Sequence, residues 1–399
     1  MPKSLASPLI TMPSGMSDDH RLIRESARRF AEEQIAPIAT ELWEEEGFPY
    51  AVWREAAQYG FSGLPYSEQD GGSGGDWLSF VIVLEEFARI DCAIANAFMA
   101  NSSAATLLSE FGNEAQKAAW LLPILQGEAI GAIGLTEPNA GSDASALRTR
   151  AELDGDCWRL NGAKTFISNS GTEITGPIVV AAVTGTRSDG RKAISNFIVP
   201  HGTPGLSYGR KLKKIGWRAS STYELFFDNC HISSENLLGA EGAGLRQTLG
   251  TVTGGRILIA ALALGILQGS LDRAHAYLKE RSAFGKRLES FQALQFKIAD
   301  MARDAYTSRL AIYDAARRKD AGEAYALEAT IAKLHASECA MSAAHQAVQI
   351  HGGYGICSEF AVARAFGDAK VLEIVEGTSE IQRQIIARTM GLGLEDGKC

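Results

Sequence analysis

The sequence predicts an α+β multidomain fold: a helical N-terminal domain, a central antiparallel β barrel or sandwich, and a C-terminal helical bundle. Apolar residues recur at helical spacing in the first and last parts of the chain, whereas the middle holds short β-branched runs between turn residues. At 399 residues the chain exceeds what one hydrophobic core supports. We therefore expect a flexible leader over residues 1–15 and domains over residues 16–125, 126–240 and 241–399.

The first domain is expected to be helical. Its leader, MPKSLASPLITMPSG, resembles neither a signal peptide nor an Arg-rich transit peptide. A breaker-rich loop over residues 60–75 precedes helices predicted over residues 77–90 and 94–111, and Asn113 can cap a further helix. The stripe that predicts the first helix, before Pro37 stops it, consists of Leu22, Ile23, Ala27, Phe30 and Ala31.

The middle domain is expected to be built from short strands. Asp154-Gly155-Asp156 and Ser188-Asp189-Gly190 are typical hairpin turns. Because no helical pattern separates the strands, an antiparallel arrangement is favoured. The predicted strands include residues 158–160, 165–168, 178–183, 196–199 and 224–227.

The last domain is expected to be an up-down helical bundle. One helix carries a stripe of Leu294, Ile298, Met301 and Ala305, and the next carries Leu327, Ile331, Leu334, Met341 and Val348. A final helix begins after Thr378, a plausible N-cap, with Glu380 in its first turn. Ile381, Ile385 and Thr389 should form its buried face.

Composition narrows the possible functions. The net charge of −8 argues against a nucleic-acid surface, and no uninterrupted apolar run approaches the roughly 20 residues of a membrane span. The six cysteines form no CxxC pair and the seven histidines form no HExxH, so we expect no metal site and no disulfide framework. A reducing, cytoplasmic setting fits this cysteine usage.

Four segments can carry chemistry, and each also has a purely structural interpretation. LTEPNAGSD (135–143) offers hydroxyls and exposed N–H groups to a ligand, or is an interdomain turn. TFISN (165–169) places Phe166 and Ser168 on one face of a strand, where they can contact a ring or simply pack. RSAFGKRLESFQ (281–292) suits a phosphate beside an adenine, or is a solvated charge run. QIHGGYG (349–355) allows close backbone approach to a ligand, or is a C-cap.

A fifth segment, VLEIVEGTSEIQRQIIAR (371–388), places Glu376 just outside the start of a helix. That position suits a general base, and it also suits an ordinary surface glutamate. Glu373 cannot be told apart from Glu376 on local pattern. No GxGxxG follows a strand and opens a helix, so a Rossmann nucleotide site is not predicted.

In this order, LTEPNAGSD, TFISN, RSAFGKRLESFQ, QIHGGYG and EIVEGTSEIQR resemble the acyl-CoA dehydrogenase family of flavoproteins, over residues 17–392. The resemblance is to the short- and medium-chain-like branch. It implies helical, β and four-helix domains in that order, as periodicity also predicts. It further implies an oxidoreductase acting on a CH–CH group in fatty acid or branched-chain acyl metabolism. An acyl-CoA substrate, FAD, an electron-transferring flavoprotein as acceptor and a homotetramer all follow from the resemblance.

The resemblance also implies the site residues. Ser142, Arg256 and Gly377 are expected at the substrate, and Arg281, Phe284 and Gln292 match positions that reach FAD across a subunit interface. The full set expected to contact FAD is Thr136, Ser142, Phe166, Ser168, Arg281, Phe284, Gln292, Gln349, Gly352, Gly353, Thr378 and Glu380.

Glu376 matches the catalytic base of this branch. Another branch carries its base near Arg256, where this chain has Gly254 and Gly255, so Glu376 is the candidate that remains. The base removes the α-proton of a thioester, the β-hydrogen leaves as hydride to flavin N5, and the product is a trans-2-enoyl-CoA. A glutamate in an apolar pocket should have a raised pKa.

Two departures and three alternatives follow. Val375 stands where tyrosine is common in the family. Together with Gly254 and Gly255, it predicts a roomier or differently shaped acyl pocket. Gly367 stands where an arginine is common in the family, and we expect only a structural effect from it. The first alternative is a same-fold enzyme acting on an acyl-carrier-protein thioester. The second is an oxidase or monooxygenase relative. A nucleic-acid-associated flavoprotein is disfavoured by the short, near-neutral tail GLGLEDGKC.

Overall fold

The computed structural model describes residues 9–393. Two compact units divide the chain, and they interleave along the sequence. The unit that we call the helical unit comprises Met1–Thr40, Val81–Cys92 and Arg256–Cys399, and the sheet unit comprises Glu41–Phe80 and Ala93–Gly255. The domain boundaries predicted at residues 125 and 240 stay a prediction. The end of the tail GLGLEDGKC lies outside the described residues.

The helices up to the sheet follow the predicted pattern closely. They are α1 (Asp18–Phe30), α2 (Ala39–Glu45), α3 (Tyr50–Gln58), α4 (Trp77–Ile90), α5 (Cys92–Phe111), α6 (Glu114–Gln116) and α7 (Leu122–Leu125). Asn113 caps α6 through a reciprocal capping box, which confirms that prediction. The predicted stripe on α1 is confirmed at Ala27, Phe30 and Ala31, which are buried. It is wrong at Leu22, which is 62% exposed, whereas Arg24 is buried on the same helix.

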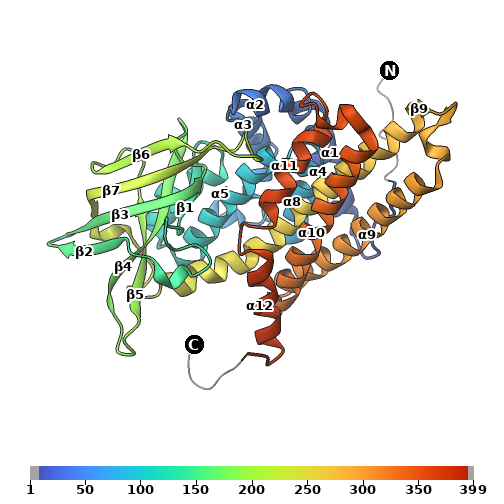
Figure 1. Ribbon diagram of the computed structural model, residues 1–399. Coiled ribbons are helices and arrows are strands. Elements are labelled where there is room, and N and C mark those ends of the chain that lie inside the picture. Colours follow the sequence, from blue (N-terminus) through green and yellow to red (C-terminus); the bar gives the residue numbers. More distant parts are fainter. Residues whose placement is uncertain (1–8, 394–399) are drawn as a thin grey trace. The chain divides into compact units, whose positions relative to one another are not determined.

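Eight strands form one sheet in the sheet unit, in the order β6-β7-β3-β2-β4-β5-β8 with β1 beside β4 (Figure 1). The strands are β1 (Ile130–Gly134), β2 (Arg150–Asp154), β3 (Cys157–Ser168), β4 (Thr175–Thr186), β5 (Lys192–Val199), β6 (Leu206–Lys211), β7 (Thr222–Ser233) and β8 (Leu237–Leu238). Both predicted hairpins are present, β2–β3 and β4–β5. The expectation of a purely antiparallel sheet is wrong, because β4 pairs in parallel with β1 and β2.

Alternation along the strands places two sets of apolar residues on opposite faces of the sheet. Ile178 and Val180 of β4 join a core with Trp158 and Phe197 from neighbouring strands. Val179, between them, packs instead against helical residues of the same unit, among them those of α5 and α7. The sheet is therefore covered on one face by helices and lined on the other by its own side chains.

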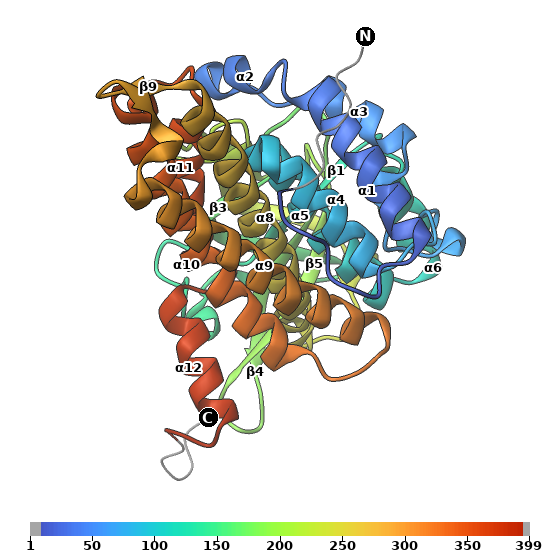
Figure 2. The same ribbon diagram turned by 90° about the vertical axis from the view of Figure 1, so that its right-hand side faces the viewer.

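The remaining helices are α8 (Gly244–Glu280), α9 (Gln292–Asp320), α10 (Ala326–His351), α11 (Ala361–Leu372) and α12 (Ser379–Thr389), with a hairpin of β9 (Ser282–Ala283) and β10 (Lys286–Arg287) before α9. α10 lies beside α9, α11 and α12 (Figures 1 and 2). The stripe predicted on α10 is wrong: Ile331 is exposed and Leu334 half-buried, and the buried face is built from alanines with Lys333 and Ser337. On α12 the buried residues are Ser379 and Gln382 rather than the predicted Ile381, Ile385 and Thr389.

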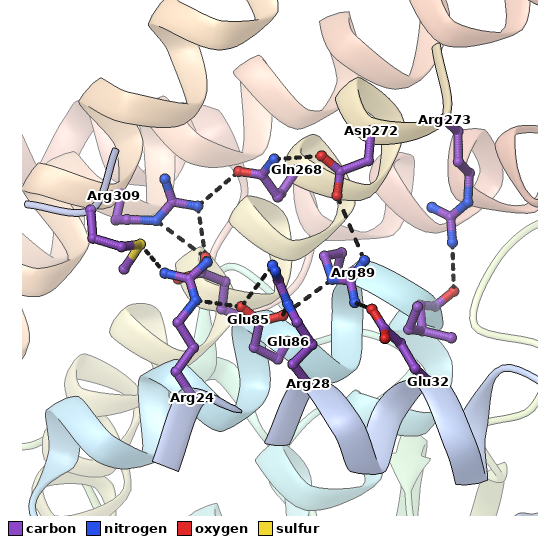
Figure 3. Close-up of polar contacts among 12 residues, drawn as sticks. Arg24, Arg28, Glu32, Glu85, Glu86, Arg89, Gln268, Asp272, Arg273 and Arg309 are labelled. Atoms are coloured by element: carbon purple, nitrogen blue, oxygen red, sulfur yellow. Dashed lines mark hydrogen bonds and ion pairs between the residues drawn. The ribbon is translucent and has the colours of Figure 1, made fainter. Parts of the chain in front are cut away.

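A largely buried network of charged side chains links α1, α4, α8 and α9 of the helical unit (Figure 3). Glu85 of α4 pairs with Arg309 of α9 at 2.7 Å and accepts from the Tyr313 hydroxyl at 2.8 Å. Glu86 pairs with Arg24 of α1 at 2.7 Å. The further members of the network are Arg28, Glu32, Arg89, Gln268 and Asp272. A Cβ at Gly265 would lie 2.6 Å from the Glu85 carbonyl oxygen, so glycine is what lets α8 approach α4 here.

Within residues 9–393 one helix, α8, is long and apolar enough to cross a membrane, with a mean hydropathy of 1.7 in its most apolar window. Glycine and glutamine interrupt the apolar residues of α8, so the helix is apolar on average without containing an uninterrupted apolar run of that length. The most apolar window is 78% buried inside the protein, which is the environment of a core helix.

Candidate active site

Glu376 lies on the short connection between α11 and α12 in the helical unit (Figure 1). The connection begins where the Val375 N–H donates to the Val371 carbonyl at 3.1 Å. It closes where the Ser379 N–H donates to the Glu373 carbonyl at 3.0 Å. Between these points Glu376 and Gly377 have φ values of 53° and 90°. A left-handed conformation at a glutamate costs of order 1 kcal/mol, so the surrounding contacts must maintain it.

Two buried side chains hold this strained backbone. Gln382 of α12 donates from Nε2 to the Glu376 carbonyl at 2.9 Å and to the Gly377 carbonyl at 2.8 Å. Lys333 of α10 donates from Nζ to the Gly377 carbonyl at 2.8 Å. Thr378 caps α12 by accepting from the Ile381 N–H, which confirms the predicted N-cap. The connection is thus fixed from two helices and by its own cap.

The carboxyl group of Glu376 is shielded from solvent although the residue as a whole is only half-buried. Its Oε2 atom is inaccessible and has no hydrogen-bond partner among the described residues. Burial raises the pKa of Glu376 to about 7, and the nearby cations Arg256 and Lys333 oppose part of this rise. A carboxyl group with such a pKa can accept and release a proton near neutral pH.

Glu373 has a different environment from Glu376. Its carboxylate pairs with Lys370 at 2.6 Å on the surface of the same segment. The two glutamates that the local pattern could not separate are therefore distinguished by burial and pairing.

Arg256 approaches Glu376 from α8. It is buried, its Nη1 donates to the Thr330 hydroxyl at 3.4 Å, and its Nε has no partner among the described residues. Burial lowers the pKa of Arg256, and Glu376 opposes that shift. The helical unit therefore brings together Glu376, Gly377, Thr378 and Arg256 of the predicted site, with Glu380 exposed on the first turn of α12.

The remaining predicted residues of the helical unit lie near the ends of α8 and α10. Phe284 and Gly285 form the tip of the β9–β10 hairpin with φ values of 52° and 77°, and the Phe284 ring is 93% exposed. Arg281 and Gln292 are exposed on either side of this hairpin. Gly352 ends α10 with a φ of 60° and donates to the Gln349 carbonyl, and Gly353 follows it. Tyr277 stacks on His351 at 4.2 Å between ring centroids, which places the two helix ends together.

In the sheet unit the structure brings Thr136 next to β3, because the Thr165 N–H donates to the Thr136 carbonyl at 2.9 Å. A bulge between Lys164 and Ile167 holds Phe166 at a φ of 60° with its ring 67% exposed. Ile167 is buried between Phe166 and the half-buried Ser168, as the alternation predicts. Ser142 is exposed on the loop that follows Thr136.

Sequence reasoning missed a buried ion pair beneath this loop. Lys164 is fully buried, and its Nζ donates to Glu137 Oε1 at 2.8 Å and to the Leu135 carbonyl at 3.0 Å. Glu137 also accepts from the N–H groups of Arg148 and Thr149. A lysine in the interior of a strand is the signal that could have revealed this pair. Lys333, a lone cation in an alanine-rich helix, gave a similar signal.

Three family profiles match successive parts of the chain. They are the N-terminal, middle and C-terminal domains of acyl-CoA dehydrogenase, at residues 17–128, 132–230 and 242–391.

The chain belongs to the acyl-CoA dehydrogenase family.

Relatives cover nearly the whole length of this family member. The short-chain specific acyl-CoA dehydrogenase of Clostridium acetobutylicum is 44% identical over 378 residues, which cover 94% of this chain and 99% of the relative. Butyryl-CoA dehydrogenase from Megasphaera elsdenii superposes with a TM-score of 0.91 at 40% identity, over 95% of this chain and 100% of that one. The predicted fold class is thereby confirmed, and the chain is an oxidoreductase of this family.

Three further structures are relevant to cofactor, partner and substrate. A chain from a structure of the electron transferring flavoprotein of Acidaminococcus fermentans matches with a TM-score of 0.91 at 40% identity, over 96% and 100% of the two chains. A glutaryl-CoA dehydrogenase from Mycobacterium smegmatis in complex with FADH2 matches with a TM-score of 0.89 at 29% identity, over 94% and 95%. The prolyl acyl carrier protein oxidase AnaB matches with a TM-score of 0.90 at 30% identity, over 95% and 100%.

The family is flavin-dependent, and features of each unit suit a flavin. The sheet unit presents the exposed ring of Phe166 from a strained bulge, which suits contact with a planar heteroaromatic ring. The helical unit presents the exposed Arg281 at the base of the β9–β10 hairpin and the exposed Phe284 ring at its tip. The guanidinium suits a phosphate group, and the aromatic ring suits stacking on an adenine. The residues present therefore fit the cofactor.

Proposed function

We propose that the chain is an FAD-dependent acyl-CoA dehydrogenase that converts an acyl-CoA thioester into the trans-2-enoyl-CoA. Bound FAD would supply the acceptor for the β-hydride. Glu376 would remove the α-proton, and Arg256 and Gly377 would lie at the substrate. In the sheet unit, Thr136, Ser142, Phe166 and Ser168 would contact FAD. In the helical unit, the β9–β10 hairpin and the end of α10 would contact FAD.

One observation carries the proposal: the unpartnered, shielded carboxyl oxygen of Glu376, with a pKa of about 7. A thioester α-proton is weakly acidic, so its removal needs a base that is deprotonated at working pH and stabilisation of the enolate oxygen. The Glu376 N–H makes no hydrogen bond within the described residues, so it is free to donate to that oxygen. Base and donor would then come from one residue.

The test is Glu376→Gln, with Glu373→Gln as the matched control on the same connection. We expect Glu376→Gln to keep its yellow flavin and to lose bleaching by acyl-CoA by at least a thousandfold, because glutamine cannot accept the proton. Glu373→Gln should bleach at the wild-type rate, because the Glu373 carboxylate is engaged in an ion pair with surface Lys370 rather than held unpaired. Undiminished bleaching of Glu376→Gln in stopped-flow absorbance would refute the assignment.

The names of the relatives support a short-chain acyl-CoA as substrate, whereas Val375, with Gly254 and Gly255, predicts a roomier or differently shaped acyl pocket. Anaerobic titration of the flavin with straight and branched acyl-CoAs separates the two. A strict preference for butyryl-CoA would contradict the roomier pocket, and Val375→Tyr should then leave the preference unchanged.

An electron-transferring flavoprotein would take the electrons, in line with the Acidaminococcus structure. We expect it to reoxidise the substrate-reduced protein faster than air does.

A homotetramer would complete the FAD site at Arg281 and Gln292. The exposed apolar side chains of Phe296, Leu310 and Ile331 on α9 and α10 suit such an interface. A monomer that keeps full FAD in light scattering would contradict this assembly.

The similarity to AnaB supports one alternative function, in which the substrate is a carrier-protein thioester and oxygen is the electron acceptor. Flavin reduction by an acyl-carrier protein but not by acyl-CoA would favour the carrier-protein thioester as substrate. Reoxidation by air within seconds would favour an oxidase.

We also propose a reducing, cytoplasmic setting. Cys157, Cys230, Cys339 and Cys357 are free thiols, which supports it. Cell fractionation is the test, and recovery outside the cytoplasmic fraction would contradict it.

A further inference from the structure

The backbone at Glu376 is held by donors that no predicted role explains. Its carbonyl and that of Gly377 together accept three hydrogen bonds, two from Gln382 and one from Lys333. Both donor residues are fully buried. Every one of these bonds acts on the two residues whose φ values are positive. The donors therefore act where the backbone stores strain.

Lys333 is a costly choice for packing alone. It occupies a helix face made mostly of alanines, where an apolar residue of similar length would fit without removing a charge from water. Its ammonium group has one hydrogen-bond acceptor, the Gly377 carbonyl, and lies near Glu376. A buried cation at this point therefore has its main interactions with the Glu376 segment.

We propose that Lys333 is a positioning residue for Glu376, which fixes the left-handed backbone through the Gly377 carbonyl and places a positive charge beside the carboxylate. The inference rests on the proposed role of Glu376 as base. Gln382 supplies the neutral part of the same function, because its amide holds both carbonyls without adding charge. Both residues therefore hold the geometry, Lys333 alone of the two adds charge, and each can be changed separately.

The charged groups around Glu376 come from three helices. Arg256 faces it from α8 and Lys333 from α10, and both favour the deprotonated carboxylate. Glu373, at the end of α11, and Glu338, on α10, interact with Lys333. Burial lowers the pKa of Lys333 to about 8, so at pH 7 the ammonium is mostly charged while Glu376 titrates. Loss of this charge would shift the titration of Glu376 to higher pH.

The experiment compares Lys333→Met, Lys333→Arg and Gln382→Met in the holoenzyme, with Lys370→Met as the control. Lys370 is an exposed lysine on α11, six residues before Glu376, and it forms an ion pair with Glu373. Two quantities are measured. The first is the pH dependence of kcat and KM. The second is the titration of the Glu376 carboxyl, followed by infrared difference spectroscopy with Glu376→Gln as the reference that identifies its band. Flavin content per protein verifies folding.

Lys333→Met should lower kcat tenfold to a hundredfold with little change in KM, because misplacing the base weakens the chemical step. The fall of kcat on the acid side of its pH profile and the infrared titration of Glu376 should both move to higher pH. Lys333→Arg should restore both titrations, and Gln382→Met should lower kcat without moving them. Lys370→Met should change neither. If Lys333→Met does not fold, the contrast between Lys333→Arg and Gln382→Met still decides the proposal.

Wild-type kcat and titration in Lys333→Met, or an equal shift in Lys370→Met, would overturn the proposal. The infrared readout follows the carboxyl itself. It therefore decides the role of Lys333 even if Glu376→Gln proved active and the proposed function failed.

Discussion

At the scale of the residue, the acidity of Glu376 reflects a balance between burial and two cations. Burial favours the neutral acid, while Arg256 and Lys333 favour the carboxylate. Neither cation approaches within ion-pair distance of it in the described structure, so burial dominates and the pKa settles near 7. A tight pair would have fixed the carboxylate in its charged form and made it a weaker base.

The raised pKa of Glu376 predicts opposite pH trends for activity and stability. Activity needs the carboxylate, so kcat/KM should fall as pH drops through about 7. The folded protein holds this proton more tightly than the unfolded chain, so stability from Glu376 is lost as pH rises from 4.5 through about 7. Because the residue is half-buried, about 3 kcal/mol is an upper bound for this loss.

Thermal unfolding of wild type and Glu376→Gln measures the stability trend. Glu376→Gln should melt at a higher temperature than wild type at pH 8, and the two should converge near pH 5. A difference independent of pH would show that Glu376 keeps an ordinary pKa.

At the scale of the element, β3 is shaped by a charge in its interior. Lys164 reaches under the loop after β1 to Glu137 and the Leu135 carbonyl, and the bulge that follows turns the Phe166 ring outward. Burial lowers the pKa of Lys164 to about 8, and Glu137 opposes this. The ion pair therefore ties the loop bearing Thr136 to the strand bearing Phe166.

We predict that Lys164→Met destabilises the protein by about 3 to 5 kcal/mol, because Glu137 would remain buried without its partner. The double variant Lys164→Met/Glu137→Gln should recover part of the loss. The midpoint of thermal unfolding and the flavin content measure both effects. Equal stability of Lys164→Met and wild type would mean that water replaces the ammonium group.

At the scale of the whole molecule, the charge network around Glu85 and Glu86 organises the helical unit. It joins α1, α4, α8 and α9, which are far apart in the sequence (Figure 3). Interactions with Arg309 and Arg24 outweigh burial and lower the pKa of Glu85 to about 2. The stability that Glu85 contributes is therefore present above pH 4.5 and is lost as pH falls toward 2.

Arg309→Met should cost about 3 to 5 kcal/mol, because it strands the Glu85 carboxylate in the interior. Arg318→Met, on the exposed side of the same helix α9, should leave the midpoint of denaturant unfolding nearly unchanged, because its ion pairs are screened by solvent. Denaturant unfolding of the two variants at pH 7 checks this contrast. A comparable loss in both would show that the network contributes no more than surface pairs.

The sequence by itself determined the order of helical and β regions, the caps at Asn113 and Thr378, both hairpins and the family. These features depend on local periodicity, on turn-forming residues, or on short sequence motifs, all of which can be recognised from the order of residues alone. Sequence reasoning misjudged which faces are buried on α1, α10 and α12. There, Arg24 is buried against the distant carboxylates of Glu85 and Glu86, and Lys333 and Gln382 are buried because the backbone carbonyls of Glu376 and Gly377 accept their hydrogen bonds.

Only the tertiary structure decided how Glu376 differs from Glu373. Both carboxylates occupy the same short segment, and no local pattern ranks them. Their difference comes from Arg256, Lys333 and Gln382, which lie 120, 43 and 6 residues away in the sequence. Burial and charge act through space, so a pKa of about 7 arises only once α8, α10 and α12 have assembled around the carboxyl group.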